Sequence, residues 1–158
     1  MPASVKPHNG TPALFLDGQP TFASYLWASA PVPTGYPSAQ AARAYARAGI
    51  HTHAFDLGSR GASVEWRGPR PGHPGHFDFS TVQARFQHVL DADPEARFHL
   101  RVHVETRPWW EALYPDECEL SAGGERLHQS LASVVWREQV NEFLRAYIAH
   151  VDAIGLAD

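Results

Sequence analysis

Polar side chains that could do chemistry are concentrated in the middle of the sequence, between residues 97 and 117. Apolar and polar residues alternate from residue 97 to residue 105, which is the period of a strand with one packed face. The polar face ends in Glu105 and Arg107, and two adjacent indoles, Trp109 and Trp110, follow. Carboxylate and guanidinium groups bind hydroxyls, and an indole offers a flat apolar surface. The combination is suited to binding a sugar.

Two further residues belong to the same group because they end the first two predicted strands. Trp27 ends the first strand and Asp56 ends the second. Each candidate also has a structural interpretation: Trp27 or one of the paired indoles could pack against the core, and the carboxylates could form internal ion pairs with Arg101 or Arg107. The predicted substrate-binding residues are Trp27, Asp56, Glu105, Arg107, Trp109 and Trp110, and no catalytic residue is predicted.

Composition narrows the class of protein. The chain has 158 residues, enough for one domain with a real core, and its net charge is −4. It therefore offers no basic surface for nucleic acid or for an anionic membrane. Cys118 is the only cysteine, which we interpret as a bystander thiol. No signal peptide, transmembrane span or cofactor motif is visible, so the sequence predicts a cytoplasmic protein without a cofactor.

Before residue 57, turn and cap signals predict an arm, a hairpin and the first strand–helix–strand unit. Residues 1–12 are expected to form a loose arm, and residues 13–158 the main domain. Asp17-Gly18 lies between two apolar pairs, which is a hairpin signal. The expected elements are a strand at 22–27, a helix at 39–48 with Ser38 as N-cap and Gly49 as C-cap glycine, and a strand at 50–56.

After a long loop at residues 57–78, the alternation of strands and helices continues. A helix is expected from Ser80, with Gln83 completing a capping box, and the 97–105 strand follows. A last helix carries apolar residues at helical spacing from Val140 to Val151. Three strand–helix units predict a parallel sheet, and long loops after the strands are typical of a (β/α)8 TIM barrel. The fold class predicted is α/β, an incomplete barrel of three units with an N-terminal hairpin.

Several motifs, taken in order, resemble clan A glycoside hydrolases, nearest to the β-galactosidase-like enzymes around family 42. The resemblance spans roughly residues 14–158. The motifs are Ala48-Gly-Ile50 leading into a strand, Trp66, Pro74-Gly-His-Phe-Asp-Phe-Ser80 before a helix, Phe98-His-Leu-Arg-Val102, Pro108-Trp-Trp110, and Ser133-Val-Val-Trp-Arg137 opening the last helix.

The resemblance implies a retaining mechanism with two carboxylates. In that family the acid/base follows the fourth strand and the nucleophile the seventh, and neither position has a counterpart in this chain. We therefore expect an N-terminal portion of a carbohydrate-active barrel, inactive by itself, whose open barrel edges allow self-association. A non-catalytic carbohydrate-binding or truncated protein is an alternative.

A metal-dependent hydrolase of the amidohydrolase type is the other alternative. His51 and His53 have the H-x-H spacing of metal ligands on one strand face. The pair lies at the start of its strand, directly after Gly49, and that end of a barrel strand contributes to stability. Hydrogen-bonded core histidines, without a bound metal, are the favoured interpretation.

Overall fold

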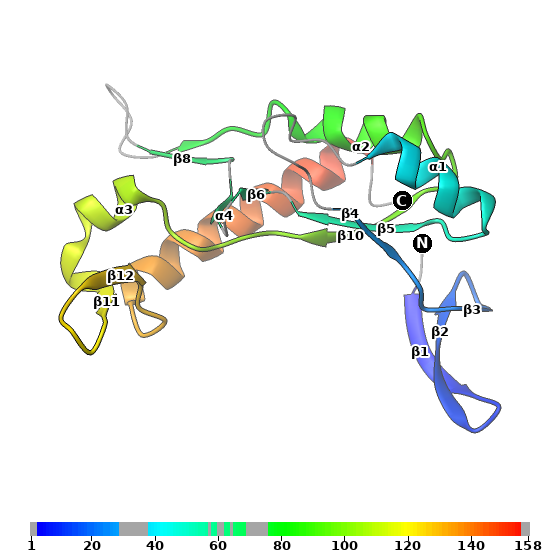
Figure 1. Ribbon diagram of the computed structural model, residues 1–158, viewed down its shortest axis with the longest axis horizontal. Helices are drawn as coiled ribbons and strands as arrows, with labels where there is room; N and C mark the ends of the chain where they lie inside the picture. The colour runs from blue at the N-terminus through cyan, green and yellow to red at the C-terminus, as the bar shows by residue number, and fades with distance from the viewer. Residues whose placement is uncertain are drawn as a thin grey trace.

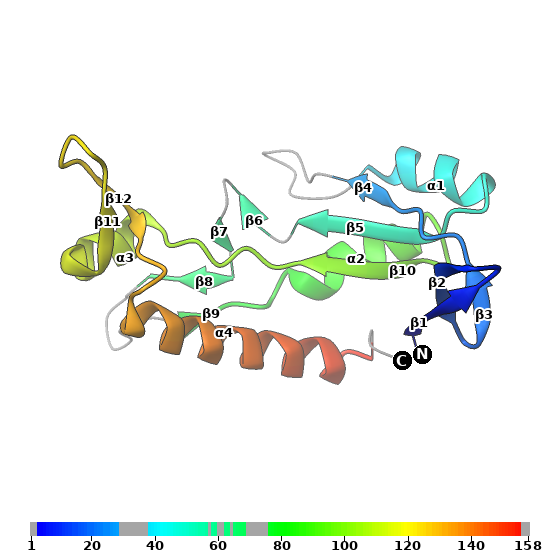
Figure 2. The same cartoon turned by 90° about the horizontal axis from the view of Figure 1, so that it is seen from below.

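The computed structural model describes residues 3–28, 38–56, 58–59, 62–63, 65–68 and 76–155. The described part is elongated, with an antiparallel sheet at one end and a helix–hairpin unit at the other (Figures 1 and 2). A small parallel sheet lies between them, and the long helix α4, Val134–Ala153, runs along its side. None of the helices in the described ranges combines the length and the apolar run needed to cross a bilayer.

The N-terminal sheet is built from two tight turns. Strands β1 (Ala3–His8), β2 (Thr11–Leu16) and β3 (Gln19–Thr21) pair antiparallel in that order. Asp17-Gly18 has positive φ at both residues and joins β2 to β3, so the predicted hairpin is confirmed. Asn9-Gly10 forms an equivalent turn, with φ of 50° and 82°. The expectation of a loose arm is therefore wrong: the Asn9-Gly10 turn lets β1 pair antiparallel with β2.

The parallel sheet contains three short strands in the order β4, β5, β10. Strands β4 (Leu26–Ala28), β5 (Thr52–Asp56) and β10 (Arg97–Arg101) pair parallel, with Leu26 opposite His53 and His53 opposite Phe98. This row faces the interior, and Phe98 contacts the ring of Phe86 at 4.8 Å between centroids. The predicted alternation of β10 is correct: Phe98 and Leu100 pack against the core, and His99 is exposed.

Helices α1 (Ala39–Arg47) and α2 (Val82–Leu90) cover one face of this sheet (Figure 1). The caps of α1 are as predicted: Ser38 Oγ accepts from Ala41 N, and Gly49 has φ of 78°. The capping box predicted for α2 is wrong. Its N-cap is Thr81, which makes no side-chain cap bond, and Asp78 Oδ1 instead accepts from Ser80 N in the preceding turn.

The core is formed by the apolar stripes of α2 and α4 together with the rings between them. Helix α4 has Ser133 as its N-cap, whose Oγ accepts from Trp136 N at 3.0 Å. Its apolar stripe is buried as predicted at Val140, Phe143, Tyr147 and Val151, whereas Ile148 is 59% exposed. Phe143 is fully buried, and its burial stabilises the fold by about 1.5–3 kcal/mol. Buried core residues include Ala42, Trp66, Val82, Phe86, Val89, Trp110, Val140, Phe143, Tyr147 and Val151.

The predicted incomplete TIM barrel is wrong. In the described part of the chain the strands belong to five small, separate sheets, and the parallel sheet contains three strands. The segments expected to be loops after the second and third strands form local antiparallel pairs instead. These pairs are β6 (Gly58–Ser59) with β7 (Ala62–Ser63), β8 (Trp66–Arg67) with β9 (His76–Phe77), and β11 (Cys118–Leu120) with β12 (Arg126–Gln129). Local hairpins satisfy backbone groups within themselves, so these segments do not repeat a βα unit.

The segment after β10 also differs from the expected loop. Strand β10 ends at Arg101, before the predicted end at Glu105, and Pro108 is the first residue of helix α3, Pro108–Leu113. Proline is favoured at that position because its missing N–H would have no helical partner. A 3-10 turn, Pro115–Glu117, then leads into β11. The paired tryptophans are therefore on a helix, where Trp109 and Trp110 point in different directions.

Candidate functional site

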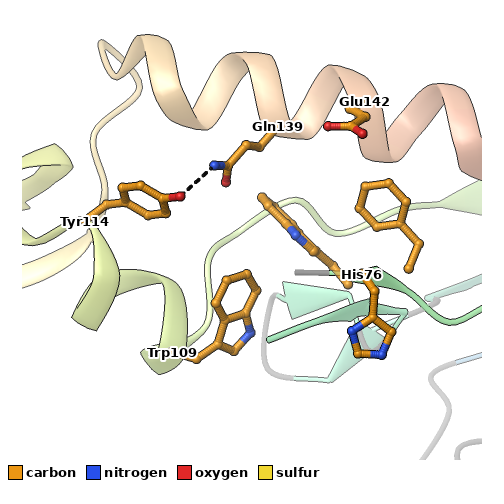
Figure 3. A pocket seen from close by; sticks show the side chains of 7 residues that line it. His76, Trp109, Tyr114, Gln139 and Glu142 are labelled. Atoms are coloured by element: carbon orange, nitrogen blue, oxygen red, sulfur yellow. Dashed lines mark hydrogen bonds between the residues drawn. The ribbon is translucent and has the colours of Figure 1, made fainter. Parts of the chain in front are cut away.

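A pocket of about 400 Å³ lies where α3, α4 and the β8–β9 hairpin meet (Figure 3). We call it the Trp109 pocket, and its described lining consists of Trp66, His76, Phe77, Trp109, Tyr114, Gln139 and Glu142. Aromatic rings form most of the wall, and α4 contributes two polar side chains that point toward the pocket. A cavity of this size that combines aromatic walls with a few polar groups is typical of a small-molecule site.

The wall formed by Trp66 is rigid. Its indole is stacked on Phe143, with 5.8 Å between centroids and 14° between planes. The preceding residue, Glu65, is fully buried and accepts from Arg85 Nη1 at 2.7 Å, which ties β8 to α2. The carbonyl of Glu65 also accepts from Asp78 N at 2.8 Å. Trp66 is therefore fixed before any ligand enters.

Trp109 forms the second aromatic wall. Its ring is 6.0 Å from that of Trp66, and the planes are 78° apart, so the two indoles form a corner. Gly68 lies against the Trp109 indole, because a Cβ at position 68 would be only 2.8 Å from Trp109 Cγ. The Nε1 atom of Trp109 is buried and has no hydrogen-bond partner among the described residues. This N–H is therefore a buried donor that no described residue satisfies.

Gln139 is held by two hydrogen bonds. Its Oε1 accepts from Trp110 Nε1 at 2.7 Å, and its Nε2 donates to the Tyr114 hydroxyl oxygen at 3.1 Å (Figure 3). Because the indole N–H can only donate, these contacts fix the orientation of the amide. The hydroxyl hydrogen of Tyr114 remains available to donate to an acceptor in the pocket.

Glu142 supplies the only carboxylate in the described lining of the pocket. It lies three residues after Gln139, on the same side of α4 (Figure 3). Its side chain is exposed and forms no hydrogen bond or ion pair with another described residue. Arg145, three residues further on, is likewise exposed and does not pair with it. The carboxylate is therefore available to a ligand.

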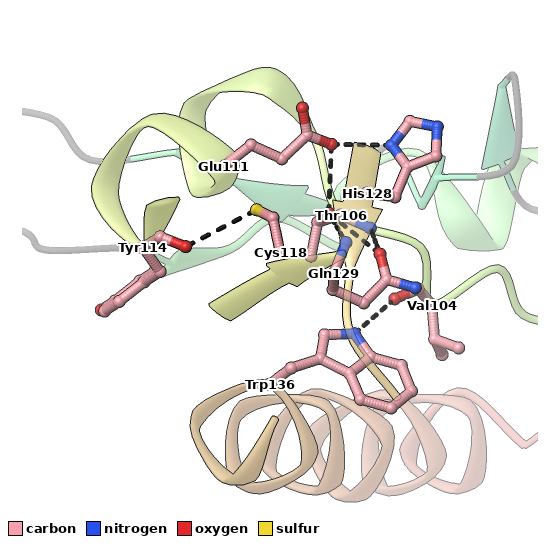
Figure 4. Close-up of polar contacts among 8 residues, drawn as sticks. All are labelled: Val104, Thr106, Glu111, Tyr114, Cys118, His128, Gln129 and Trp136. Carbon is pink, nitrogen blue, oxygen red and sulfur yellow. Dashed lines mark hydrogen bonds and ion pairs between the residues drawn. The ribbon is translucent and has the colours of Figure 1, made fainter. Parts of the chain in front are cut away.

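The backbone that carries Trp109 is anchored by buried polar contacts (Figure 4). Gln129 Oε1 accepts from Thr106 N at 2.8 Å and from Thr106 Oγ1 at 2.9 Å. Trp136 Nε1 donates to the Val104 carbonyl at 3.0 Å. These bonds hold the chain between β10 and α3 against β12 and α4, and so they set the position at which α3 begins.

The Glu111–His128 pair and the thiol of Cys118 lie beside these anchoring contacts (Figure 4). Glu111 Oε1 is 2.7 Å from Nδ1 of His128, an exposed residue. Cys118 is a buried free thiol that donates to the Tyr114 carbonyl, and burial, followed by the charge of Glu111, raises the pKa of that thiol. A raised pKa leaves little thiolate at neutral pH, which agrees with the interpretation of Cys118 as a bystander.

The six predicted site residues do not meet in one place. Trp109 lines the pocket, whereas Trp110 is fully buried and supports Gln139. Trp27 is 57% exposed on β4, with the Arg101 guanidinium 4.4 Å from its ring centroid. Glu105 is exposed and lies 3.4 Å from His103, and Arg107 is the N-cap of α3. The Asp56 side chain lies outside the described part of the structure.

His51 and His53 both contact one carboxylate. His51 Nδ1 donates to Asp93 Oδ1 at 2.9 Å, and His53 Nε2 donates to Asp93 Oδ2 at 2.7 Å. Burial by itself would raise the pKa of Asp93, but the hydrogen bonds from both histidines outweigh it and hold this pKa below its usual value. No group of three or more potential ligands within the described ranges is placed to hold a metal ion. The interpretation of these residues as hydrogen-bonded histidines is confirmed.

Sequence reasoning missed most of the pocket. Tyr114, Gln139 and Glu142 were not singled out, and His76 and Phe77 were noted only within a motif. The three-residue spacing of Gln139 and Glu142 indicates that both lie on one face of α4, beside its apolar stripe. Nothing in the sequence indicated that this face would lie opposite α3.

Comparisons with models of protein families, with curated proteins and with solved structures found no match to this chain. The resemblance to clan A glycoside hydrolases is therefore a prediction from sequence motifs alone.

Proposed function

We propose that this chain binds a carbohydrate in the Trp109 pocket. The observation that carries the proposal is the aromatic wall of the pocket, where the indoles of Trp66 and Trp109 form a corner and the Tyr114 hydroxyl and Glu142 lie in the same lining. The sugar ring would pack its CH groups against the indoles.

The polar groups of the pocket support the same ligand class. The Tyr114 hydroxyl can donate a hydrogen bond to a ligand, and the Glu142 carboxylate can accept one. Gln139 holds the Tyr114 hydroxyl in place through its own hydrogen bond. A sugar carries several hydroxyls, each both a donor and an acceptor, on a ring with apolar patches. Such a ligand can satisfy these groups at once, whereas a purely apolar ligand would leave them unpaired.

The pocket supports binding rather than hydrolysis. A glycosidase of the usual kind needs two carboxyl groups that flank the scissile bond, about 5–9.5 Å apart. The described lining has one, Glu142. We therefore propose that this chain binds carbohydrate. We also propose that it is a portion of a larger glycosidase-like protein.

A sugar titration tests this function. The purified chain would be titrated with neutral monosaccharides and their β-linked disaccharides, and followed by tryptophan fluorescence and calorimetry. We expect saturable binding, with an affinity that falls about fivefold to thirtyfold in Trp109→Phe, because phenylalanine offers the sugar a smaller aromatic face than tryptophan does.

Trp27→Phe is the matched comparison, since Trp27 is exposed on β4 and does not line the pocket. We expect its affinity to equal that of the unmodified chain. If binding were lost in Trp27→Phe and kept in Trp109→Phe, the sugar site would lie on the parallel sheet. If no sugar bound, the proposed function would be wrong.

A further inference from the structure

We infer that the Trp109 pocket selects sugars that carry a free, protonated amine. The inference rests on the proposed function and specifies the substrate class: an amino sugar, not a neutral one. Two features of the pocket carry it, namely the corner of indoles and the charge of the one carboxylate in its described lining.

The corner of indoles is suited to a cation. Trp66 and Trp109 are 6.0 Å apart and almost perpendicular, and Phe77 and Tyr114 add two further rings. The face of an aromatic ring carries partial negative charge, so a cation within about 6 Å of the ring is attracted, most strongly by tryptophan. Because Phe143 and Gly68 pack against the two indoles, the corner exists before binding and needs no rearrangement.

The charge of the pocket favours the same ligand. The carboxylate of Glu142 pairs with none of the other described residues. No lysine or arginine is present in the described lining. An ammonium group placed between the indole corner and Glu142 would gain both a cation–π contact and an ion pair. A sugar carboxylate or phosphate would instead be repelled by Glu142.

A hydrogen-bond donor separates an amino sugar from a simple cation. The Tyr114 hydroxyl can present its hydrogen to the pocket, and an ammonium group cannot accept it. Ring hydroxyls can. The ligand that uses the whole pocket therefore combines one amine with several hydroxyls, as a hexosamine does.

The test compares D-glucosamine, D-glucose and N-acetyl-D-glucosamine at about pH 7, where a primary amine is largely protonated. Calorimetry on the complete chain is expected to show glucosamine binding about tenfold more tightly than either neutral sugar. Glu142→Gln keeps the shape of the side chain and removes its charge. This substitution is expected to reduce the preference for glucosamine to twofold or less.

Glu138→Gln is the matched control, because Glu138 is exposed on the preceding turn of α4 and does not line the pocket. The Glu138→Gln variant should keep the full preference for glucosamine over the neutral sugars. Equal binding of glucosamine and glucose, with both weakened in Trp109→Phe, would overturn the amine preference and leave the carbohydrate proposal standing. Binding of neither sugar would overturn both. Unchanged glucosamine preference in Glu142→Gln would show that this carboxylate does not select the amine.

Discussion

At the scale of single residues, the pocket depends on a glycine that allows an indole to approach the backbone. Gly68 follows β8 directly and lies against Trp109, which comes from a helix about 40 residues later in the chain. Any side chain at position 68 would occupy the space of that ring. The orientation of the Trp109 indole, and therefore the direction of its unpartnered N–H, is set by this contact.

Gly68→Ala is expected to displace the Trp109 indole. The new Cβ would lie 2.8 Å from Trp109 Cγ, closer than such contacts allow. We expect a loss of about 1–3 kcal/mol in the free energy of unfolding, together with weaker sugar binding. Chemical denaturation and the sugar titration measure the two effects. Gly123→Ala is the control, since its nearest neighbour would be Ser121 Oγ at 3.7 Å, and wild-type behaviour of both variants would refute the packing described here.

At the scale of elements, Asp93 connects the end of α2 to the start of β5. It follows the helix by three residues, is 2% exposed, and accepts from His51 and His53 and from Glu95 N. A carboxylate with this many donors is stabilised in its ionised form despite its burial. The contact fixes the crossover between α2 and β10 against the neighbouring strand.

Asp93→Asn is expected to lower the free energy of unfolding by about 1–3 kcal/mol, because the amide cannot accept from both imidazoles and that of His53 is buried. Asp91→Asn is the control, as Asp91 is exposed and its side chain accepts a hydrogen bond from Gln87 at the helix end, away from the histidines. Urea denaturation of both variants gives the comparison. Equal stability of the two variants would mean that the histidines do not depend on the Asp93 carboxylate.

The lowered pKa of Asp93 predicts that the free energy of unfolding decreases in acid. Its folded-state pKa lies below the ordinary value of 3.8, so its contribution is fully present above that value and is lost as the pH falls through the lower, folded pKa. We expect the slope of stability against pH in this acid range to be smaller in Asp93→Asn than in the unmodified chain. Parallel slopes would assign the acid limit to other carboxyl groups.

At the scale of the whole molecule, the parallel sheet leaves edges open. In the described residues, β10 pairs with β5 on one side only. Beside its other side, a groove of about 260 Å³ is lined by Leu100, Val102, Leu144, Tyr147, Ile148, Val151 and Asp152. An unpaired strand edge next to apolar side chains is a template for pairing with a second copy. The expectation of self-association therefore rests on this edge and no longer on an unfinished barrel.

Ile148→Lys is expected to reduce self-association without unfolding the chain, because Ile148 is 59% exposed and lines this groove. Sedimentation velocity over a range of concentrations measures the effect. Leu131→Lys, at a residue that is 66% exposed and outside the groove, is the control. A concentration-independent monomer in the unmodified chain would contradict the expectation, and so would an equal effect of the two substitutions.

Local signals in the sequence determined the elements that depend on near neighbours. The Asp17-Gly18 turn, the caps of α1, the apolar stripe of α4 and the alternation of β10 were all predicted. Each depends on contacts a few residues apart, such as Ser38 Oγ with Ala41 N. The role of Asp93 was not predicted, since its partners lie 40 and 42 residues away.

Tertiary structure alone decided the architecture and the pocket. Alternating strands and helices are compatible both with a barrel and with a three-stranded sheet flanked by hairpins, and the choice depends on which edges pair. Trp66, Trp109 and Glu142 are far apart in sequence and meet only because α3 lies opposite α4. Periodicity gives the face on which a side chain lies, but the identity of the facing element depends on long-range packing, which one sequence does not encode in any local pattern.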